Sequence, residues 1–323
     1  MAATEKLSAE YILFAIGTVT SLHLLYRLLR FIHLYFIQQS KLPRYLHVGE
    51  NSYALVTGAS DGIGVELARQ LLAKGFNVIL HGRNPDKLSR IQQDLSKQFP
   101  ARRAVVIAAT ADDPQNSVPK IEKLVKDVEK QGGRLTVLIN NVGGTLMYGP
   151  TYRSLEEIPY DIVDKEISLN LRFPTLLTKT LFPVLKANKP SLIINVGSYA
   201  GDYCGPWLPI YAPSKAFNHA FSMALTSETR ATKTDIEVLG ILVAQVLSAS
   251  NFDRPSFTVL TSEECARDIL KRVGCGKRLV TASWRHCLAG EGIKWLPKEF
   301  VDWLLIQIMS QRREYEEKQR KKH

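Results

Sequence analysis

Residues 57–64 read Thr-Gly-Ala-Ser-Asp-Gly-Ile-Gly and stand between an apolar stretch and a helical pattern. Glycines at this spacing let the backbone turn tightly and let a pyrophosphate approach, while the helix N-terminus offers N–H groups and a positive dipole end. Alone, such a string is also typical of an ordinary turn. Between the first strand and first helix of an α/β unit it predicts a dinucleotide site. The residues of that site would be Gly58, Ser60, Asp61, Gly62, Ile63 and Gly64.

Strand and helix patterns alternate along the chain. We expect strands over 53–57, 77–80, 104–109, 135–139, 191–196, 236–243 and 279–283. We expect helices over 65–74, 85–98, 118–130, 160–187, 212–230 and 263–273. The strands are apolar throughout, which is typical of a parallel sheet with helices on both faces. The sequence therefore predicts a single α/β domain with a Rossmann-like, doubly wound parallel sheet.

Composition narrows the class of protein. The chain has 323 residues, 45% of them hydrophobic, and a net charge of +11. This length suits one large domain with extensions. The sequence has no zinc finger, RNA-binding signature or aromatic-basic repeat, so the charge predicts a membrane surface or an anionic ligand rather than nucleic acid. The four cysteines form no CxxC and match no metal spacing, so we expect reduced thiols facing the cytosol and no metal.

The N-terminal segment is strongly apolar. Residues 11–26 carry no charge, and the apolar pattern resumes after Arg27. The run is slightly short for a spanning helix, but Arg27 and Arg30 can snorkel toward lipid headgroups. A cleaved signal peptide is disfavoured because the preceding residues are not basic overall and no small-residue cleavage site follows. We expect a membrane anchor, with an interfacial amphipathic helix, or a helix packed on the domain or a partner, as alternatives.

The expected organisation has four parts. Residues 1–40 form the anchor or interfacial helix, 41–51 a polar linker, and 52–283 the dinucleotide-binding catalytic domain. Residues 284–323 form an amphipathic extension and a basic tail. The extension is expected to pack on the domain, with a second membrane contact as the alternative.

Two strand ends carry polar side chains. Arg83 follows the second strand, where an acidic residue would bind the ribose of NAD and an arginine accommodates the 2′-phosphate of NADP. Arg83 therefore predicts NADP(H), although Asp61 adds negative charge nearby and a plain surface arginine is the alternative. The fourth strand ends in Asn-Asn-Val-Gly-Gly, residues 140–144. Ligands bind at the carboxyl ends of such strands, although a simple turn would explain these residues equally well.

Tyr211 and Lys215 lie four residues apart, so they can share one face of a helix. There the ammonium can lower the pKa of the phenol, which then serves as proton donor to a carbonyl oxygen or as acceptor from an alcohol. Taken alone, such a pair is usually a solvated helix face.

In their order and spacing, these motifs resemble those of the short-chain dehydrogenase/reductase family over about residues 52–260. The resemblance rests on TGASDGIG (57–64), NNVG (140–143), Asn170 within SLNL, IINVGS (193–198) and YAPSK (211–215). It implies that Tyr211 is the acid/base and that Lys215 lowers its pKa and holds the nicotinamide ribose.

The same resemblance assigns roles to further residues. Ser198 would orient the substrate oxygen, and Asn170 would hold a water in the proton relay. Asn141 and Gly143 would line the cofactor site.

The chain departs from the family pattern at two places. Residues 243–248, Val-Ala-Gln-Val-Leu-Ser, replace the usual Pro-Gly and Val-x-Thr, but Val246 and Ser248 can still meet the nicotinamide carboxamide. Thr110 stands where an aspartate usually binds the adenine, and Asp112 is the expected substitute.

The apolar N-terminus together with DGIG, GRN and NNVG is similar to the endoplasmic-reticulum very-long-chain 3-oxoacyl-CoA reductases and their 17-beta-hydroxysteroid dehydrogenase relatives. Val65 stands where that subgroup often has lysine. The last four residues, Arg-Lys-Lys-His, approximate a dilysine retrieval signal, with a random basic tail as the alternative. The resemblance implies attachment to the endoplasmic reticulum membrane with the catalytic domain facing the cytosol.

The expected activity is NADPH-dependent reduction of a ketone on a lipophilic small molecule: a 3-oxoacyl thioester, a keto-steroid or a secondary-metabolite ketone. NAD-dependent oxidation of an alcohol or hydroxysteroid is one alternative. A non-catalytic NADP-binding protein that keeps the fold is another. The sequence leaves open the substrate, the physiological direction and assembly into a homo-oligomer.

Overall fold

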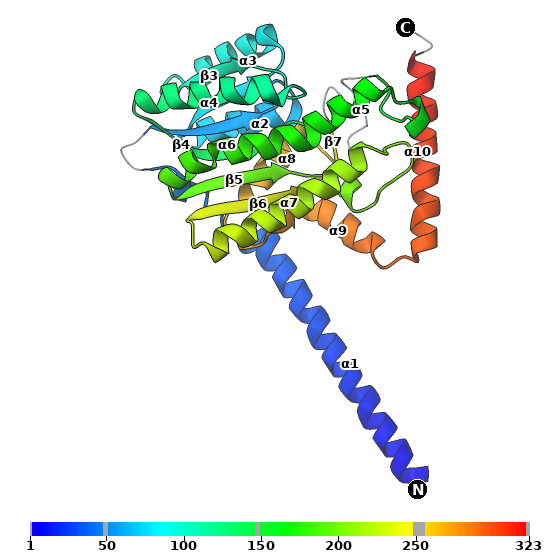
Figure 1. Ribbon diagram of the computed structural model, residues 1–323. Coiled ribbons are helices and arrows are strands. Elements are labelled where there is room, and N and C mark those ends of the chain that lie inside the picture. The colour runs from blue at the N-terminus through cyan, green and yellow to red at the C-terminus, as the bar shows by residue number, and fades with distance from the viewer. Residues whose placement is uncertain (1, 48–50, 146–148, 248–255, 321–323) are drawn as a thin grey trace. The chain divides into compact units, whose positions relative to one another are not determined.

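A computed structural model describes residues 2–47, 51–145, 149–247 and 256–320, with side chains described from residue 10 onward (Figure 1). The chain separates into two compact units, Met1–Gln39 and Ser40–His323. The first unit contains α1 (Ala2–Ile32) and the π-helical turn η1 (His33–Ile37). Residues Glu10–Ile37 form one candidate membrane span, with a mean hydropathy of 1.6 and an 18-residue apolar window whose side chains are not buried.

The second unit is built on a seven-stranded sheet in the order β3-β2-β1-β4-β5-β6-β9. All of its strand pairs are parallel. The strands are β1 (Asn51–Thr57), β2 (Asn77–Gly82), β3 (Ala104–Ala108), β4 (Gly133–Asn140), β5 (Ser191–Val196), β6 (Ile236–Leu242) and β9 (Leu279–Thr281). Two short strands, β7 (Gln245–Val246) and β8 (Val259–Leu260), form a separate parallel pair.

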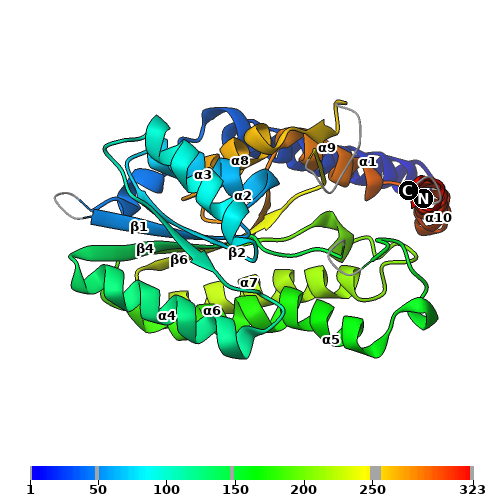
Figure 2. The ribbon, with the colours of Figure 1, turned by 90° about the horizontal axis from the view of Figure 1, so that it is seen from above.

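Helices cover both faces of the sheet (Figure 2). One layer contains α4 (Pro114–Lys130), α5 (Tyr160–Ile167), α6 (Phe173–Ala187) and α7 (Tyr211–Ala231), and the other contains α2 (Gly62–Ala73), α3 (Pro85–Gln98), α8 (Ser262–Lys271) and α9 (Trp284–Ile293). Central strand side chains such as Leu55, Leu138 and Ile193 are fully buried against the first layer. Each contributes about 1.5–3 kcal/mol of burial free energy. The predicted doubly wound parallel sheet is confirmed.

The long helix expected over 160–187 is continuous but not uniform. A π-helical turn, η5 (Ser168–Arg172), joins α5 to α6. Such turns insert one extra residue into the helical repeat and occur frequently at functional sites. This one contains Asn170.

The C-terminal stretch folds as two helices. α9 is followed by a break at Pro297 and then by α10 (Lys298–Arg320). Pro297 stands immediately before α10, and its carbonyl accepts from the N–H groups of Phe300 and Val301 in the first turn. α10 lies within the expected C-terminal extension, residues 284–323, and stands at the edge of this unit (Figure 1).

Residues 40–47 belong to the second unit and pack within it. Leu42 and Tyr45, in the 3-10 turn η2 (Leu42–Tyr45), are almost fully buried. The N–H of Lys41 donates to Val273 O at 3.0 Å. The hydroxyl of Thr136, on β4, donates to Tyr45 O at 2.7 Å. These contacts tie the start of the unit to its central sheet.

Candidate active site

The glycine-rich turn joins β1 to α2 and is too tight for side chains. Gly58 and Gly62 have φ angles of +67° and +51°, a region that favours glycine. A Cβ on Gly64 would lie 2.1 Å from Gly58 O. The turn therefore keeps its backbone exposed at the start of α2, where N–H groups favour a pyrophosphate. Because the backbone of this turn is open to a ligand, the residues present fit the pyrophosphate of a dinucleotide.

Asp61 caps α2, and its charge is offset. Its carboxylate accepts from Gly62 N–H at 2.7 Å and lies 2.8 Å from the Lys87 ammonium. Sequence reasoning treated Asp61 as unfavourable negative charge and missed Lys87. No local pattern marks Lys87, because it lies in the first turn of a different helix, α3.

Two predicted adenosine-side residues follow β2 and β3. Arg83 is exposed just before Asn84, which caps α3 by accepting from Lys87 N–H at 2.9 Å. Asp112 accepts a short hydrogen bond from the Thr110 hydroxyl. The two candidate residues for the adenine contact, Thr110 and Asp112, are thus hydrogen-bonded to each other.

Asn141 ties β4 to the glycine-rich turn. Its backbone N–H donates to Thr57 Oγ1 at 2.9 Å, and its Nδ2 donates to Thr57 O at 3.0 Å. The Thr57 hydroxyl in turn donates to Ile139 O at 3.2 Å. Asn141 thus holds the ends of β1 and β4 together, and Thr57 is a partner that sequence reasoning missed.

Asn170 and Lys215 meet at Gly143. A Cβ on Gly143 would lie 2.9 Å from both Asn170 Oδ1 and Lys215 Nζ. Asn170 is fixed because its Nδ2 donates to Glu166 O at 2.9 Å and its Oδ1 accepts from Gly144 N–H at 3.1 Å. Residues from three separate motifs therefore converge on a position that only glycine leaves open.

Lys215 lies under the ring of Tyr211. Its Nζ is 5.5 Å from the ring centroid and 3.5 Å from Val196 O. Burial lowers the pKa of Lys215 to about 8, because a charged ammonium loses hydration in the interior.

Tyr211 is the first residue of α7. Burial, the largest influence, raises the pKa of its phenol above the ordinary value, a hydrogen bond with Ser198 lowers it, and Tyr152 raises it. The Ser198 hydroxyl also accepts from Ala200 N–H at 3.1 Å. The pKa of Tyr211 therefore shifts upward, opposite to the direction that the neighbouring lysine predicts, because of burial, which the helical spacing does not reveal.

The loop after β6 is held by a residue that sequence reasoning missed. His286 Nδ1 accepts from Ala244 N–H at 3.2 Å, and its Nε2 lies 3.2 Å from Gln245 O and 3.2 Å from Thr258 O. Because Nδ1 accepts a backbone N–H and Nε2 faces two carbonyl oxygens, this arrangement assigns the ring proton to Nε2, and burial lowers the pKa of His286 in the same sense. His286 thus supports this loop without the usual Pro-Gly. Val246 is buried in β7, and Ser248 lies outside the described residues.

A buried ion pair lies behind the site. Arg153 Nη2 and Glu166 Oε1 are 2.8 Å apart, with both side chains almost fully buried. The backbone N–H of Arg153 donates to Trp207 O at 3.1 Å. Trp207 itself has a φ of +59°, which is uncommon for a bulky residue. No sequence motif marked any of the three residues.

Comparisons with known proteins identify the family of the chain. The short chain dehydrogenase family matches residues 52–255. The very-long-chain 3-oxoacyl-CoA reductase of Pyricularia oryzae is 29% identical, covering 86% of this chain and 84% of that protein. Its counterpart from Kluyveromyces lactis is 33% identical, covering 74% and 70%.

Solved structures share the fold. A 7beta-hydroxysteroid dehydrogenase superposes with a TM-score of 0.67 at 20% identity, covering 80% of this chain and 96% of its own. L-sorbose reductase from Gluconobacter frateurii, complexed with NADPH and L-sorbose, has a TM-score of 0.62 at 20% identity, covering 73% and 97%. The chain therefore belongs to the short-chain dehydrogenase family and is an oxidoreductase.

Proposed function

We propose that this protein uses NADPH to reduce a ketone on a lipophilic substrate to a secondary alcohol, with a 3-oxoacyl thioester as the first candidate. The observation that carries the proposal is the convergence of Asn170 and Lys215 on Gly143, next to the hydrogen-bonded pair Ser198 and Tyr211. The names of the curated relatives favour the 3-oxoacyl thioester over a keto-steroid or a secondary-metabolite ketone.

The roles follow from the chemistry of each group. NADPH, when bound, supplies the hydride. The Tyr211 phenol and the Ser198 hydroxyl donate hydrogen bonds to the substrate oxygen, where negative charge develops. Because burial raises the pKa of Tyr211, the phenol stays protonated at neutral pH and can act as general acid.

Lys215 and Asn170 would help return a proton to the Tyr211 phenol after it has protonated the substrate. With a pKa of about 8, the Lys215 ammonium remains mostly charged at pH 7. It can therefore hold the nicotinamide ribose and resupply Tyr211. Asn170 keeps its side chain between Glu166 O and Gly144, where it can hold the relay water.

The cofactor preference rests on charge at the end of β2. Arg83 is exposed there, and Lys87 offsets the carboxylate of Asp61 at 2.8 Å. Both cations favour the 2′-phosphate of NADP(H). The pyrophosphate would lie on Gly58, Ser60, Asp61, Gly62, Ile63 and Gly64; the adenine near Asp112; and the nicotinamide near Asn141, Gly143, Val246 and Ser248.

We also propose the arrangement in the cell. Residues 1–40 would anchor the protein in the endoplasmic reticulum membrane, and 41–51 would connect them to a cytosolic catalytic domain at 52–283. Residues 284–323 would form the C-terminal extension. The apolar segment Glu10–Ile37 supports the anchor by length and composition.

The function is tested with full-length, detergent-solubilised protein and NADPH against 3-oxoacyl-CoAs of several chain lengths, keto-steroids and aromatic ketones. Tyr211→Phe removes the proton donor, so we expect most turnover to disappear while NADPH binding is spared. Tyr160→Phe is the control, since Tyr160 is 93% exposed. Near-normal turnover in Tyr211→Phe would contradict the mechanism. Tight NADPH binding by the wild type without turnover of any ketone would favour a non-catalytic role.

The cofactor is tested separately with Arg83→Ala. A charge-assisted hydrogen bond contributes about 1.5–3 kcal/mol, so NADPH affinity should fall roughly 10- to 100-fold while NADH affinity is retained. Arg90→Ala, at an exposed position on α3, is the control. If Arg83→Ala leaves the preference unchanged, Arg83 does not determine the cofactor; a wild type that binds NADH more tightly than NADPH would favour the NAD-dependent oxidative alternative.

A further inference from the structure

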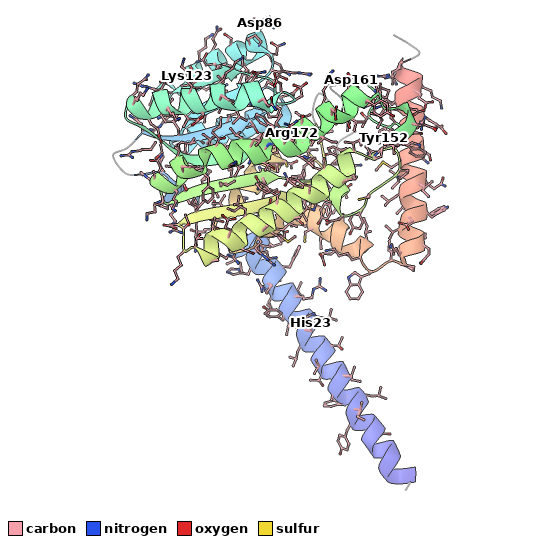
Figure 3. All side chains as sticks on the ribbon, in the orientation of Figure 1. His23, Asp86, Lys123, Tyr152, Asp161 and Arg172 are labelled. Carbon is pink, nitrogen blue, oxygen red and sulfur yellow. The ribbon has the colours of Figure 1, made fainter. Side chains whose placement is uncertain are left out.

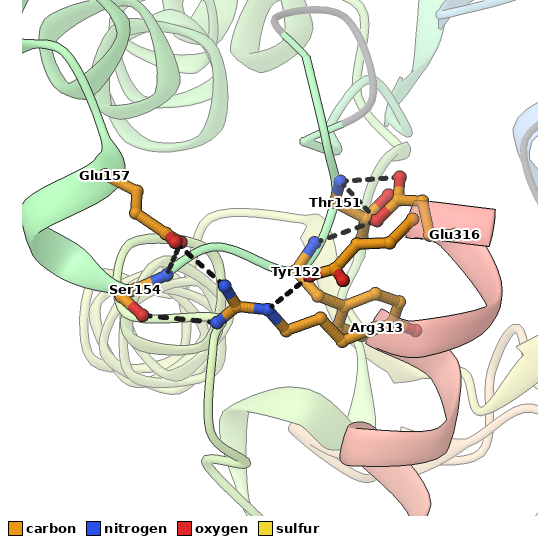
Figure 4. Close-up of polar contacts among 7 residues, drawn as sticks. Thr151, Tyr152, Ser154, Glu157, Arg313 and Glu316 are labelled. Carbon is orange, nitrogen blue, oxygen red and sulfur yellow. Dashed lines mark hydrogen bonds and ion pairs between the residues drawn. The ribbon is translucent and has the colours of Figure 1, made fainter. Parts of the chain in front are cut away.

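α10 is joined to the segment after β4 through Glu316 (Figure 4). The Glu316 carboxylate accepts from Thr151 N–H at 2.8 and 3.0 Å and from Tyr152 N–H at 3.2 Å. Hydrogen bonds to an ionised acceptor are roughly twice as strong as neutral ones. One side chain of α10 thus binds two consecutive backbone donors that no regular strand or helix satisfies.

Arg313, one turn earlier on α10, contacts the same segment. Its guanidinium donates to Ser154 Oγ at 3.2 Å and to Glu157 Oε1 at 2.8 Å. It also lies 5.5 Å from the centroid of the Trp207 ring. Because a guanidinium presents several donors in a fixed plane, this contact defines an orientation as well as a distance.

Tyr152 connects these contacts to the catalytic phenol. Arg312, also on α10, donates to the Tyr152 hydroxyl at 3.4 Å, and Figure 3 shows Tyr152 beside this helix. Tyr152 is one of the groups that raise the pKa of Tyr211. A small cavity is lined by Thr151, Trp207 and Tyr211, among others. Two residues that α10 contacts, Thr151 and Trp207, therefore line one cavity together with Tyr211.

A larger, open cavity lies beside the contact between α10 and the segment after β4. It measures about 570 Å³, and its lining includes Tyr152, Arg153, Arg313 and Glu316. The wall is shared between α10 and the segment after β4. A change in the Glu316 contact would therefore alter this cavity and, through Thr151, the small cavity that Tyr211 lines.

We propose that Glu316 and Arg313 are positioning residues that hold residues 151–157 against α10 and so determine how the substrate approaches Tyr211. The proposal rests on the proposed ketone reduction at Tyr211. The glycine-rich turn and Arg83 take no part in these contacts, so the effect should fall on the substrate and not on NADPH.

The test uses full-length protein with Glu316→Ala, Glu316→Gln and, as control, Glu314→Ala. Glu314 is on the same helix, is 68% exposed, and pairs only loosely with Lys318 at 3.8 Å. Amide hydrogen exchange of residues 151–157 is measured together with KM and kcat for the ketone and the Kd of NADPH.

In Glu316→Ala, we expect exchange at Thr151 and Tyr152 to accelerate and KM to rise about tenfold, equivalent to about 1.4 kcal/mol. The kcat should stay within about twofold and the NADPH Kd should not change. Glu316→Gln keeps an oxygen acceptor and should recover part of the loss, whereas Glu314→Ala should match the wild type.

Three results would overturn the inference: unchanged exchange in Glu316→Ala, faster exchange with an unchanged KM, or an equal loss of NADPH affinity. If the wild type turns over no ketone, both the proposed function and this inference fail. An active wild type with an unchanged KM in Glu316→Ala overturns this inference alone.

Discussion

The buried ammonium of Lys215 should make the wild-type protein less stable than a variant with an apolar side chain at this position. Lys215 is 7% exposed, and burial lowers its pKa from 10.5 to about 8. At about 1.36 kcal/mol for each pKa unit, the difference of about 2.5 corresponds to roughly 3 kcal/mol of cost for the charged form in the folded state. Lys215→Met keeps an unbranched apolar stem and removes that charge. We therefore expect turnover to be lost while the free energy of unfolding at pH 7 rises by up to roughly 3 kcal/mol.

The sign of the pH dependence identifies the cause. Between pH 8 and 10.5, the unfolded chain carries more protons at this lysine than the folded protein does. Stability of the wild type therefore increases with pH across that window through this group. The gain in unfolding free energy from Lys215→Met is fully present below about pH 8. It should vanish above pH 10.5, the pKa of the lysine in the unfolded chain. The weak contact from Nζ to Val196 O, at 3.5 Å, subtracts little from it.

The assay is urea unfolding of the full-length, detergent-solubilised protein, followed by tryptophan fluorescence at several pH values from 7 to 10. Lys179→Met is the matched control, because Lys179 is exposed on α6. The reasoning is refuted if Lys215→Met is no more stable than the wild type at pH 7. A difference that stays constant with pH would refute it equally.

Three further substitutions test other parts of the site. Gly64→Ala places a Cβ 2.1 Å from a backbone oxygen, so calorimetric titration should detect little or no NADPH binding, and unchanged affinity would contradict the fit of the turn. Glu166→Ala removes the carboxylate that pairs with the buried Arg153 and should cost about 3–5 kcal/mol of unfolding free energy. Urea titration should show the double variant Arg153→Met/Glu166→Leu losing much less; an equal loss would argue against the buried ion pair as the cause. His286→Phe removes the acceptor of a backbone N–H and should cost about 1–3 kcal/mol, with weaker NADPH binding by fluorescence titration, and full retention of both would exclude His286 as the support of its loop.

The sheet was predictable because its strands are buried on both faces and are therefore apolar without alternation. Boundaries were sharpest where a local signal exists: Asn84 and Pro85 mark the start of α3, and the expected span 85–98 matches it. The π turn at 168–172 was not predictable, since a shift in the backbone hydrogen-bond pattern leaves no residue signature. Pro297 marks the break between α9 and α10. The expectation of one amphipathic stretch did not take this proline into account.

The site divides in the same way. The glycine-rich turn and the Tyr211–Lys215 pair carry local spacing that a sequence displays directly. The partner of Thr151, by contrast, lies 165 residues away at Glu316. His286 and Ala244 are 42 residues apart. Such pairs arise only when the layers pack, so no window of sequence contains them. The same holds for burial, which decides the direction of the Tyr211 pKa.

The strand order has a consequence for how the chain is made. β1 pairs with β2 on one side and with β4 on the other, yet β4 begins at Gly133, 76 residues after β1 ends at Thr57 (133 − 57). At about 5–20 residues per second, translation needs roughly 4–15 s to deliver it. During that interval one edge of a strand that is buried in the finished protein is open, and open apolar edges recruit other chains. Slower synthesis lengthens this interval, so recovery of folded protein should rise with chaperone supply.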